Sequence, residues 1–398
     1  MQLPLDGIRV IDMTGVVMGP TTTQILGDYG ADVIKIEPPD GDTMRRAGPS
    51  RHDGMGPIFL AMNRNKRSIA LDLKKESGRA AALRLCAGAD VLIHNVRPSS
   101  MARLGLGYAA VAAARPDIVY VNLVGYGEDG PYAGKPAYDD LIQGASGIAS
   151  LLGRVSGFAP HYVPSLICDR IVGITAAHAI LAALIHRGRT GEGQAIEIPM
   201  FETMAEFVLT DHLGGSTFVP EAGPAGYARL LAANRRPYRT SDGYICALLY
   251  TDRNWQSFFT AAGQRARYDA DPLLHDGAKR AQHYDDVYGI VAEIVATRTT
   301  EEWLALMNEN DIPAMRLNDL DSLIADPHLA AVGFFREVDH PSEGRMRLMR
   351  SPARFSRTQP EPRRMPPRRG EHGEEVLREL GFVDDEIAAL REDGALAG

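Results

Sequence analysis

Short apolar stretches alternate with polar, glycine-containing segments along the first third of the chain. Residues 7–13 (GIRVIDM) and 31–39 (ADVIKIEPP) have the apolar pattern of buried strands, and residues 19–30 between them (GPTTTQILGDYG) have that of a helix. A strand, a helix and a second strand in this order predict a βαβ unit, whose strands lie parallel in one sheet. The loop after the first strand, residues 14–20, would then lie at the carboxyl end of the sheet, where open α/β sheets bind ligands.

The same alternation continues for another hundred residues. A strand in basic surroundings is expected within residues 63–74 (NRNKRSIALDLK), and a helix at residues 77–89. Buried strands follow at residues 89–98 and 117–127, with a helical stretch at residues 101–116 between them. The pattern therefore predicts an α/β domain with a Rossmann-like parallel sheet.

One long segment stands out from this pattern. Residues 169–186 contain no proline and are rich in Ala, Ile and Leu, which predicts a helix that is apolar on nearly every face and hence buried. Asp169 is a single carboxylate at the mouth of this helix. The residues alone leave two interpretations open. Asp169 caps the free N–H groups of the first turn, or it is a nucleophile that forms covalent intermediates.

The composition becomes more mixed after this helix, which indicates a second, smaller α+β domain. We expect the first part of the large domain at residues 1–205 and a glycine- and proline-rich linker at residues 206–225. The small domain is expected at residues 226–330, and residues 331–398 are expected to return to the large domain. The chain length is consistent with two domains.

The C-terminal third carries three local signals. Thr300 is a plausible N-cap of a helix in TTEEWLALMNEN. Residues 356–370 (SRTQPEPRRMPPRRG) are too rich in proline for a helix and predict an extended surface strap, with a polyanion-binding patch as the alternative. Residues 374–393 predict a pair of amphipathic helices interrupted by Gly381.

Composition narrows the class of protein. The chain has 43 basic and 51 acidic residues, a formal net charge of −8, which argues against a general nucleic-acid binder. The N-terminus lacks the apolar core of a signal peptide, and no apolar run was expected to reach the roughly 18 residues of a membrane span. Cys86, Cys168 and Cys246 form no CxxC pair and no disulfide framework. We therefore expect a cytoplasmic protein that does not bind membranes.

Familiar catalytic motifs do not fit the chain. Residues 125–130 (GYGEDG) match GxGxxG, but Pro131 and Pro136 block the helix that a dinucleotide site requires. Gly134 and Lys135 resemble the end of a phosphate-binding loop, yet the first glycine position of that motif is occupied by Asp129. GxSxG, HExxH and a two-cysteine metal knuckle are absent from the sequence.

Several stretches taken together resemble a known family. They are GIRVIDMTGVVMGP, LGDYGADVIKIEPPDGD, NRNKRSIALDLK, ADVLIHNVRP, GYGEDGPYAGKPAYD, RTGEGQAIEIPM and GEHGEEVLRELGFVDDEIAAL. In this order they are similar to the class III coenzyme A transferases of the CaiB/BaiF family. The resemblance covers nearly the whole chain.

The resemblance implies a fold, an assembly and a mechanism. It implies a Rossmann-like large domain built from both chain ends, a smaller domain between them, and two chains interlocked as rings in a homodimer. Asp169 matches the family's catalytic aspartate, which forms an aspartyl–acyl anhydride and then an aspartyl-CoA thioester. The substrates would be an acyl-CoA and a carboxylic acid, with no permanently bound cofactor and no metal.

The resemblance also implies where coenzyme A would bind. Val17 and Met18 would lie along the pantetheine, and Lys135 and Tyr138 would close over the thioester end. The remaining matched positions would border the adenine or flank the nucleotide; they are Leu71, Asp72 and Lys74, and Asn95, Val96 and Arg103. Arg97 and Lys75 are further candidate phosphate partners because of their charge.

One departure from the family pattern and two alternative functions bear on this expectation. The formyl-CoA transferase branch has a glutamine where this chain has Val17, so we expect a larger or more apolar acid than formate or oxalate. An α-methylacyl-CoA racemase is the alternative enzyme, but the racemase histidine is absent before Asp139, where Tyr138 stands. A non-catalytic CoA-binding protein is the alternative outside enzymes, and the carboxylate of Asp169 argues against it.

Overall fold

A computed structural model describes residues 2–397 and divides the chain into two compact units. Unit 1 comprises the chain up to Ser146, Val163–Glu206 and the chain from Leu329 onward. Unit 2 comprises Gly147–Tyr162 and Phe207–His328. The sequence analysis placed residues 147–162 in the large domain, whereas they group with unit 2. They contain a short helix, α7 (Ile148–Ser156), with positive-φ glycines at both ends that interrupt the chain.

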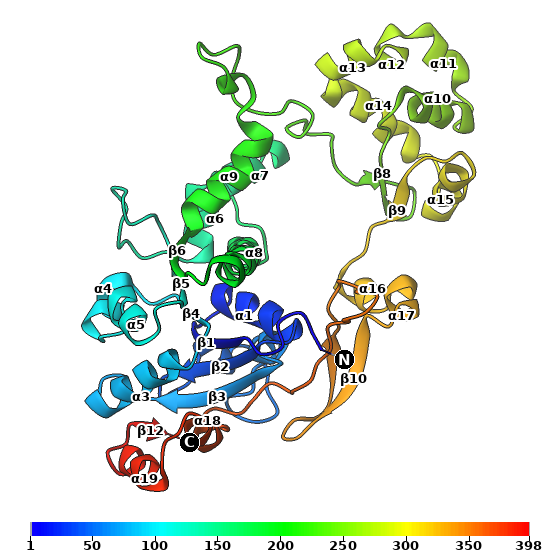
Figure 1. The fold of residues 1–398 in the computed structure, drawn as a ribbon. Coiled ribbons are helices and arrows are strands. Elements are labelled where there is room, and N and C mark those ends of the chain that lie inside the picture. Colours follow the sequence, from blue (N-terminus) through cyan, green and yellow to red (C-terminus); the bar gives the residue numbers. More distant parts are fainter. Residues whose placement is uncertain (1, 398) are drawn as a thin grey trace. The chain divides into compact units, whose positions relative to one another are not determined.

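Unit 1 contains the expected α/β sheet (Figure 1). Its seven strands lie in the order β12-β3-β2-β1-β4-β5-β6, and β1 to β6 pair in parallel. The parallel strands are β1 (Arg9–Met13), β2 (Asp32–Glu37), β3 (Lys66–Leu71), β4 (Val91–His94), β5 (Val119–Val124) and β6 (Gln194–Pro199). The last strand, β12 (Leu396–Ala397), pairs antiparallel with β3. The predicted parallel sheet is therefore confirmed.

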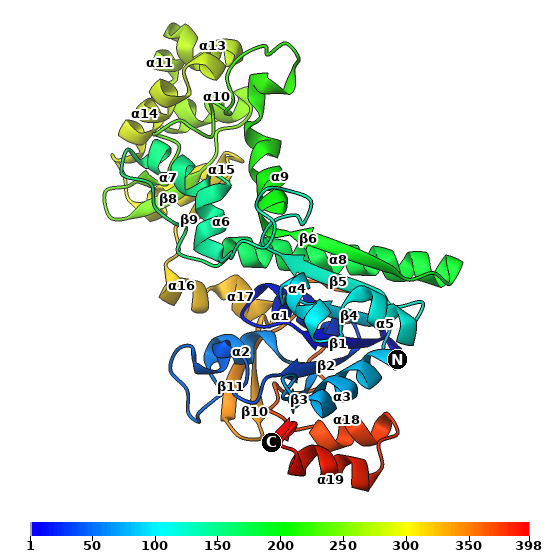
Figure 2. The same cartoon turned by 90° about the vertical axis from the view of Figure 1, so that its left-hand side faces the viewer.

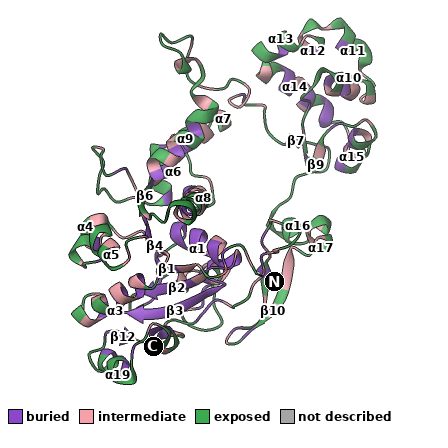
Figure 3. Ribbon diagram, in the orientation of Figure 1, coloured by how far each residue is buried: buried purple, intermediate pink, exposed green. Residues whose placement is uncertain are grey.

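Helices cover both faces of this sheet because side chains alternate along each strand. One face packs Ile11, Ile34 and Ile69 against apolar residues of α3 (Glu76–Ala87), α5 (Tyr108–Ala114), α18 (Gly373–Glu379) and α19 (Asp384–Glu392). The other face lies under α1 (Met18–Asp28) and α8 (Ile167–Thr190), and Figure 2 shows α8 along β5 and β6. Figure 3 shows the central strands buried between these layers.

The remaining helices of unit 1 are short. They are α2 (Pro57–Met62), α4 (Pro98–Arg103), α6 (Asp139–Ala145), the 3-10 turn Thr43–Arg46 and the first part of α9 (Met200–His212). The helical stretch expected at residues 101–116 is in fact part of two helices, α4 and α5. Gly105 separates them with a φ of 72°, a left-handed conformation that a glycine adopts readily.

The C-terminal segment returns to unit 1 as expected. A hairpin of β10 (Phe335–His340) and β11 (Gly344–Met349) precedes the proline- and arginine-rich strap, which is extended. The strap lies along β3, where the carbonyl of Arg364 accepts from the N–H of Asn65 at 2.9 Å. Further along, the N–H of Gly370 donates to Oγ of Ser68 at 2.8 Å. The predicted pair of closing helices corresponds to α18 and α19.

Unit 2 is a small α+β unit with its own core. Its antiparallel sheet has the order β7 (Tyr238–Arg239), β8 (Tyr244–Ala247) and β9 (Ala314–Arg316). The helices after α7 and α9 are α10 (Asp252–Ala261), α11 (Arg265–Ala270), α12 (Pro272–His275), α13 (Gly277–Gln282), α14 (Tyr284–Val295), α15 (Thr300–Glu309), α16 (Leu320–Ile324) and the first residues of α17 (Pro327–Ala331). The N-cap of α15 is Thr299, which forms a capping box with Glu302, so the expectation of Thr300 was one residue late.

The long helix α8 differs from its prediction in two ways. It begins at Ile167 with Leu166 as N-cap, so Asp169 lies inside the first turn and the N-cap interpretation is wrong. It is also less buried than its composition suggested. Its inner face packs against α1, where a Cβ on Gly173 would lie 2.6 Å from the carbonyl oxygen of Met18, whereas Ile174 and Ile185 are both 56% exposed.

The same helix bears on the question of membranes. By length and composition alone α8 could cross a bilayer, with a mean hydropathy of 1.6 over 18 residues, contrary to the expectation that no apolar run reaches this length. A long core helix meets the same criterion. Val172, Ala176 and Ile180 are buried in unit 1, which is the behaviour of a core helix.

Candidate active site

A cavity of about 370 Å³ opens at the carboxyl edge of the parallel sheet in unit 1. Its walls come from the loop after β1, the loop after β4, the end of β5 with the loop that follows, and the starts of α6, α8 and α9. Asp169 lines the cavity. The cavity thus lies where a parallel α/β sheet is expected to bind its ligand.

The loop after β1 is held rigidly by buried side chains. The carbonyl of Thr14 accepts from Nζ of Lys35 at 2.7 Å. The N–H of Gly15 donates to Oδ1 of Asn95 at 3.1 Å, and Nδ2 of Asn95 donates back to the carbonyl of Gly15 at 3.0 Å. The N–H of Val16 donates to Oδ1 of Asp42 at 3.2 Å. These bonds fix the backbone that faces the cavity.

Val16 shows that this loop is strained. Its φ is 69°, a left-handed conformation that is unfavourable for a β-branched residue. Such strain persists only where the surroundings over-determine the backbone, and it concentrates at functional sites.

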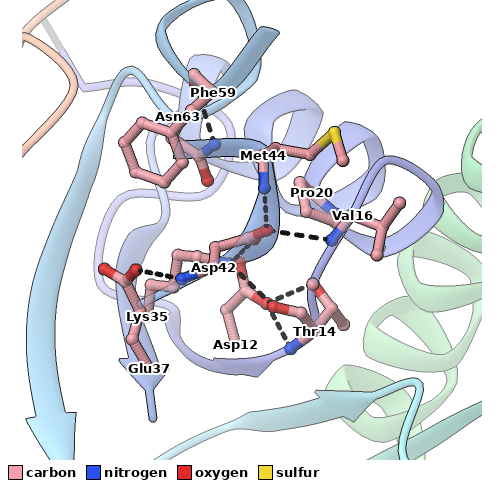
Figure 4. Close-up of polar contacts among 12 residues, drawn as sticks. Asp12, Thr14, Val16, Pro20, Lys35, Glu37, Asp42, Met44, Phe59 and Asn63 are labelled. Atoms are coloured by element: carbon pink, nitrogen blue, oxygen red, sulfur yellow. Dashed lines mark hydrogen bonds and ion pairs between the residues drawn. The ribbon is translucent and has the colours of Figure 1, made fainter. Parts of the chain in front are cut away.

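A buried network of charges supports the loop from below (Figure 4). Lys35 lies 3.0 Å from Oδ2 of Asp42 and is itself fully buried. Burial alone lowers the pKa of Lys35, but Asp12, Asp42 and Glu37 outweigh it and raise the pKa above its usual value. Lys66 pairs with Asp12 at 3.1 Å, yet burial lowers the pKa of Lys66 to about 8. The charges offset one another, so the network holds the loop without leaving an isolated buried ion.

A second carboxylate lies against Asp169. Oδ1 of Asp139 accepts from the backbone N–H of Asp169 at 2.9 Å, and Oδ2 accepts from Nε2 of Gln143 at 2.7 Å. Oε1 of Gln143 accepts in turn from the N–H of Val163 at 2.8 Å. These bonds tie α6 to the segment that enters α8, and they position Asp169 in the wall of the cavity.

The surroundings of Asp169 disfavour its charge. Its side chain is 9% exposed, and burial followed by the nearby Asp139 raises the pKa of Asp169 to about 7, with Arg170 acting in the opposite direction. The sequence analysis left N-capping by Asp169 open as one of two interpretations, and no side-chain cap hydrogen bond is formed at the start of α8.

Two cations and an amide face the same cavity. Arg97 and Asn95 come from the loop after β4, and Lys135 comes from the loop before α6. Nζ of Lys135 lies 4.1 Å from the ring centroid of Tyr132. Such groups are suited to bind the phosphates or carbonyl groups of an extended anionic ligand.

Residues 5–373 match the sequence profile of CoA-transferase family III. The chain belongs to this family. An acyl-CoA transferase from Fusarium pseudograminearum is 33% identical over 403 residues, covering 98% of this chain and 88% of the relative. A formyl-CoA:oxalate CoA-transferase from Escherichia coli O6:H1 is 30% identical over 419 residues, covering 100% of both chains.

Solved structures agree with this assignment. A CaiB/BaiF family protein from Brucella suis has a TM-score of 0.81 at 30% identity, covering 96% of this chain and 100% of that one. The hypothetical protein Rv3272 from Mycobacterium tuberculosis has a TM-score of 0.81 at 28% identity, covering 94% and 99%. The chain is therefore an enzyme of the CoA-transferase type, and its substrates include CoA or an acyl-CoA.

The transferase cavity brings together about half of the residues predicted to form the site. Asp169, Met18, Asn95, Lys135 and Tyr138 all line it. The matched positions outside its lining are Val17, Leu71, Asp72, Lys74, Val96 and Arg103.

The residues outside the lining have identifiable surroundings. Val17 is fully buried as the N-cap of α1, and Leu71 belongs to the core and pairs with Leu396. Arg103 donates to Oγ of Ser100 at 2.8 Å. Lys75, suggested from its charge, contacts Asp393 instead. A role of these residues in CoA binding stays a prediction.

Sequence reasoning missed two residues that shape the site. Asp139 was noticed only as the neighbour of a missing histidine, although its carboxylate contacts the backbone of Asp169. Asp42 was not singled out, because nothing in the local pattern of PPDGD shows that it binds a loop 26 residues earlier. The only signal in the sequence was an aspartate beside Gly41, at the start of a loop rich in glycine and arginine.

Proposed function

We propose that the enzyme transfers coenzyme A from an acyl-CoA donor to a carboxylic acid through covalent intermediates on Asp169. The observation that carries this proposal is the position of Asp169. It is a nearly buried carboxylate in the wall of the cavity at the carboxyl edge of the parallel sheet. A carboxylate is a weak nucleophile in water. Partial desolvation and a fixed position beside a bound thioester make it competent.

The reaction balances without a co-reactant. An Oδ atom of Asp169 attacks the thioester carbonyl and the C–S bond breaks, so that CoA leaves as a thiolate and a mixed anhydride of Asp169 and the donor acid remains. The thiolate attacks the aspartyl carbonyl, which releases the donor acid as a carboxylate and leaves an aspartyl-CoA thioester. The acceptor carboxylate attacks this thioester and expels the thiolate. The thiolate then attacks the acceptor carbonyl, forming the new acyl-CoA and regenerating the carboxylate of Asp169.

Each addition step develops an oxyanion that needs hydrogen-bond donors. The first residues of α1, Met18 and Gly19, have backbone N–H groups without an acceptor in residues 2–397. Met18 lines the cavity, and the approach of α1 to Gly173 places this end of α1 beside α8. We assign the oxyanion-stabilising role to these N–H groups and to the positive end of the α1 dipole.

The cations of the cavity rim would hold the CoA chain. Lys135 and Tyr138 would cover the thioester end, and Asn95 and Arg97 would face the phosphates. The cavity of about 370 Å³ would take up the acyl and thioester part of the substrate, and the nucleotide would extend outward over the loop after β3. Asp72 and Lys74 lie in that loop, which is how the matched positions outside the cavity would contribute.

The acid is expected to have an apolar body. Leu123, Val124 and Met200 line the cavity, whereas Val17, which stands where the formyl-CoA branch has a glutamine, is buried outside its lining. The related formyl-CoA:oxalate CoA-transferase acts on small polar acids. A cavity with these apolar walls favours an acid with a hydrocarbon chain.

We further propose that two chains form an interlocked homodimer in the cytoplasm. The exposed Ile174 and Ile185 on α8 leave an apolar surface that a second chain would bury. The interlocked arrangement of the two chains is inferred from the resemblance to the family.

A substrate panel tests the function. Acyl-CoA donors from acetyl-CoA to longer and branched acyl-CoA are mixed with carboxylic acids, and exchanged CoA esters are detected by mass spectrometry. We expect exchange with at least one pair, loss of exchange in Asp169→Asn, and retention in Asp140→Asn, an exposed neighbouring carboxylate. Exchange that survives in Asp169→Asn would contradict the proposal.

A further inference from the structure

Unit 2 contains a second cavity, of about 210 Å³, lined by residues of β7, β8, α14 and the segments beside β7 and β8. Three arginines line it, Arg229, Arg235 and Arg236, all from the segment before β7. Every residue that lines this cavity belongs to unit 2. This cavity shares no lining residue with the one that contains Asp169, and the proposed transfer reaction uses none of its residues.

The charges around this cavity are unbalanced. No aspartate or glutamate lines it, and within residues 2–397 none of the three guanidinium groups forms an ion pair with a carboxylate. Some arginines elsewhere do, as with Arg67 and Asp32 at 2.7 Å. Three like charges around one concavity repel one another, and a bound anion relieves that repulsion.

The buried hydroxyl group of Tyr288 provides a further hydrogen-bond donor beside the arginines. Tyr288 is 5% exposed, and its hydroxyl oxygen accepts from Nε of Arg229 at 3.0 Å. The hydroxyl hydrogen has no acceptor in the part of the chain that the structure describes, so it remains available to a ligand in the cavity. A planar guanidinium with a neighbouring O–H is suited to the two oxygens of a carboxylate.

The rest of the wall is apolar and the volume is small. Pro237, Leu248 and Leu249 line the remaining surface, which suits a short hydrocarbon body and not a fully hydrated phosphate. A volume of about 210 Å³ is also too small for a CoA molecule. We propose that this cavity is an accessory site that binds the carboxylate of a small organic acid.

Cys246 provides a reporter inside the cavity. It lines the cavity and is exposed, whereas Cys86 and Cys168 are buried, which raises the pKa of each thiol to about 12. Iodoacetate and iodoacetamide both alkylate a thiolate with loss of iodide, and they differ in that iodoacetate is itself a small carboxylate. Labelling of Cys246 is followed by peptide mass spectrometry on the full-length protein.

We expect iodoacetate, but not iodoacetamide, to label Cys246 with a rate that saturates as its concentration rises. Arg235→Gln and Arg236→Gln should each lower the rate ratio of iodoacetate to iodoacetamide about tenfold, as expected for the loss of one charge-assisted hydrogen bond. Arg239→Gln is the matched control. Arg239 is exposed on β7 outside the cavity, and its substitution should leave the ratio unchanged. A linear rate, or equal ratios in all four proteins, would overturn the proposal.

Protection of Cys246 from alkylation by added anions tests which chemical group binds and in which cavity it binds. Butyrate should slow the alkylation of Cys246 by iodoacetamide in a saturable way, and inorganic phosphate at the same concentration should protect less. Protection by phosphate that equals or exceeds that by butyrate would overturn the carboxylate assignment. The experiment is repeated in Asp169→Asn protein, where the same protection is expected. Protection that disappears in this variant would show that the acid binds at the catalytic cavity instead.

Discussion

Oδ1 of Asp139 accepts a hydrogen bond from the backbone N–H of Asp169 at 2.9 Å. This bond places a second, buried carboxylate beside the proposed nucleophile, and Gln143 holds it there through a hydrogen bond of 2.7 Å. The contact orients the first turn of α8. It also makes the charged form of Asp169 harder to reach, because a like charge adds to the effect of burial.

The first prediction concerns the pH dependence of transfer. Because burial and Asp139 raise the pKa of Asp169 to about 7, the nucleophilic carboxylate is depleted as the pH falls below that value. We expect kcat/KM to fall with an apparent pKa near 7 on the acid side. A rate that stays constant down to pH 5 would be inconsistent with Asp169 as an ionised nucleophile.

The second prediction separates the contribution of Asp139 from that of burial. Asp139→Asn keeps the carbonyl oxygen that accepts from the N–H of Asp169 and removes the like charge. The acid limb of the pH profile should move to lower pH, yet stay above the ordinary aspartate value of 3.8, because burial is the larger cause. Asp140→Asn is the matched control and should leave the acid limb in place.

The third prediction concerns stability. The folded-state pKa of Asp169 is raised from 3.8 to about 7, so the folded protein binds the proton more tightly, and stability falls as the pH rises from about 4 to about 7. Asp169→Asn removes this loss. Between pH 4 and pH 8 its free energy of unfolding should rise relative to wild type by on the order of 2–4 kcal/mol. Urea denaturation at both pH values measures the free energies of unfolding. If the difference between the variant and the wild type does not grow with pH, the raised pKa of Asp169 is contradicted.

The fourth prediction concerns CoA binding. Arg97→Ala and Lys135→Ala should each weaken the binding of CoA by roughly 1–3 kcal/mol, because each removes a charge-assisted hydrogen bond at the rim of the cavity. Arg391→Ala, at an exposed residue of α19, is the control and should bind CoA like the wild type. Titration calorimetry measures the affinities. Arg103→Ala in the same series decides whether a matched residue outside the cavity contributes.

The fifth prediction concerns assembly. Sedimentation should show a homodimer that persists on dilution, because the apolar outer face of α8 would be exposed in a single chain. Ile174→Asp should weaken this dimer, whereas Leu320→Asp, at a residue 78% exposed in α16, should not. A folded, stable wild-type monomer at low concentration would rule out an obligate dimer.

The sequence predicted the sheet well, for a physical reason. β1 and β2 each carry a Val-Ile pair and a further apolar residue within five or six positions and are flanked by turn residues, so their local pattern is sufficient to identify them. The helix at residues 101–116 was predicted as one because its alanines outweighed Gly105, which in fact ends α4. Local preference identified the elements, and it failed where a single glycine determined the break.

The site was harder to predict because its geometry depends on distant residues. Asp169 was found through the resemblance of its surroundings to a family motif. The relation between Val16 and Asp42 joins two loops that approach each other only after the sheet has formed. The raised pKa of Asp169 depends in the same way on how α6 packs beside α8, which no local pattern encodes.

The central claim is that Asp169 becomes covalently bonded to the acyl group or to CoA during turnover. Incubation with a competent acyl-CoA and then with hydroxylamine should convert Asp169 into a hydroxamate, because hydroxylamine attacks an anhydride or a thioester but not a free carboxylate. Mass spectrometry of the peptide that contains Asp169 measures the conversion. We predict a donor-dependent mass shift on Asp169 that is absent when the donor is omitted. Turnover of a competent donor with the label on Cys168, or with no label on the chain, would contradict this account.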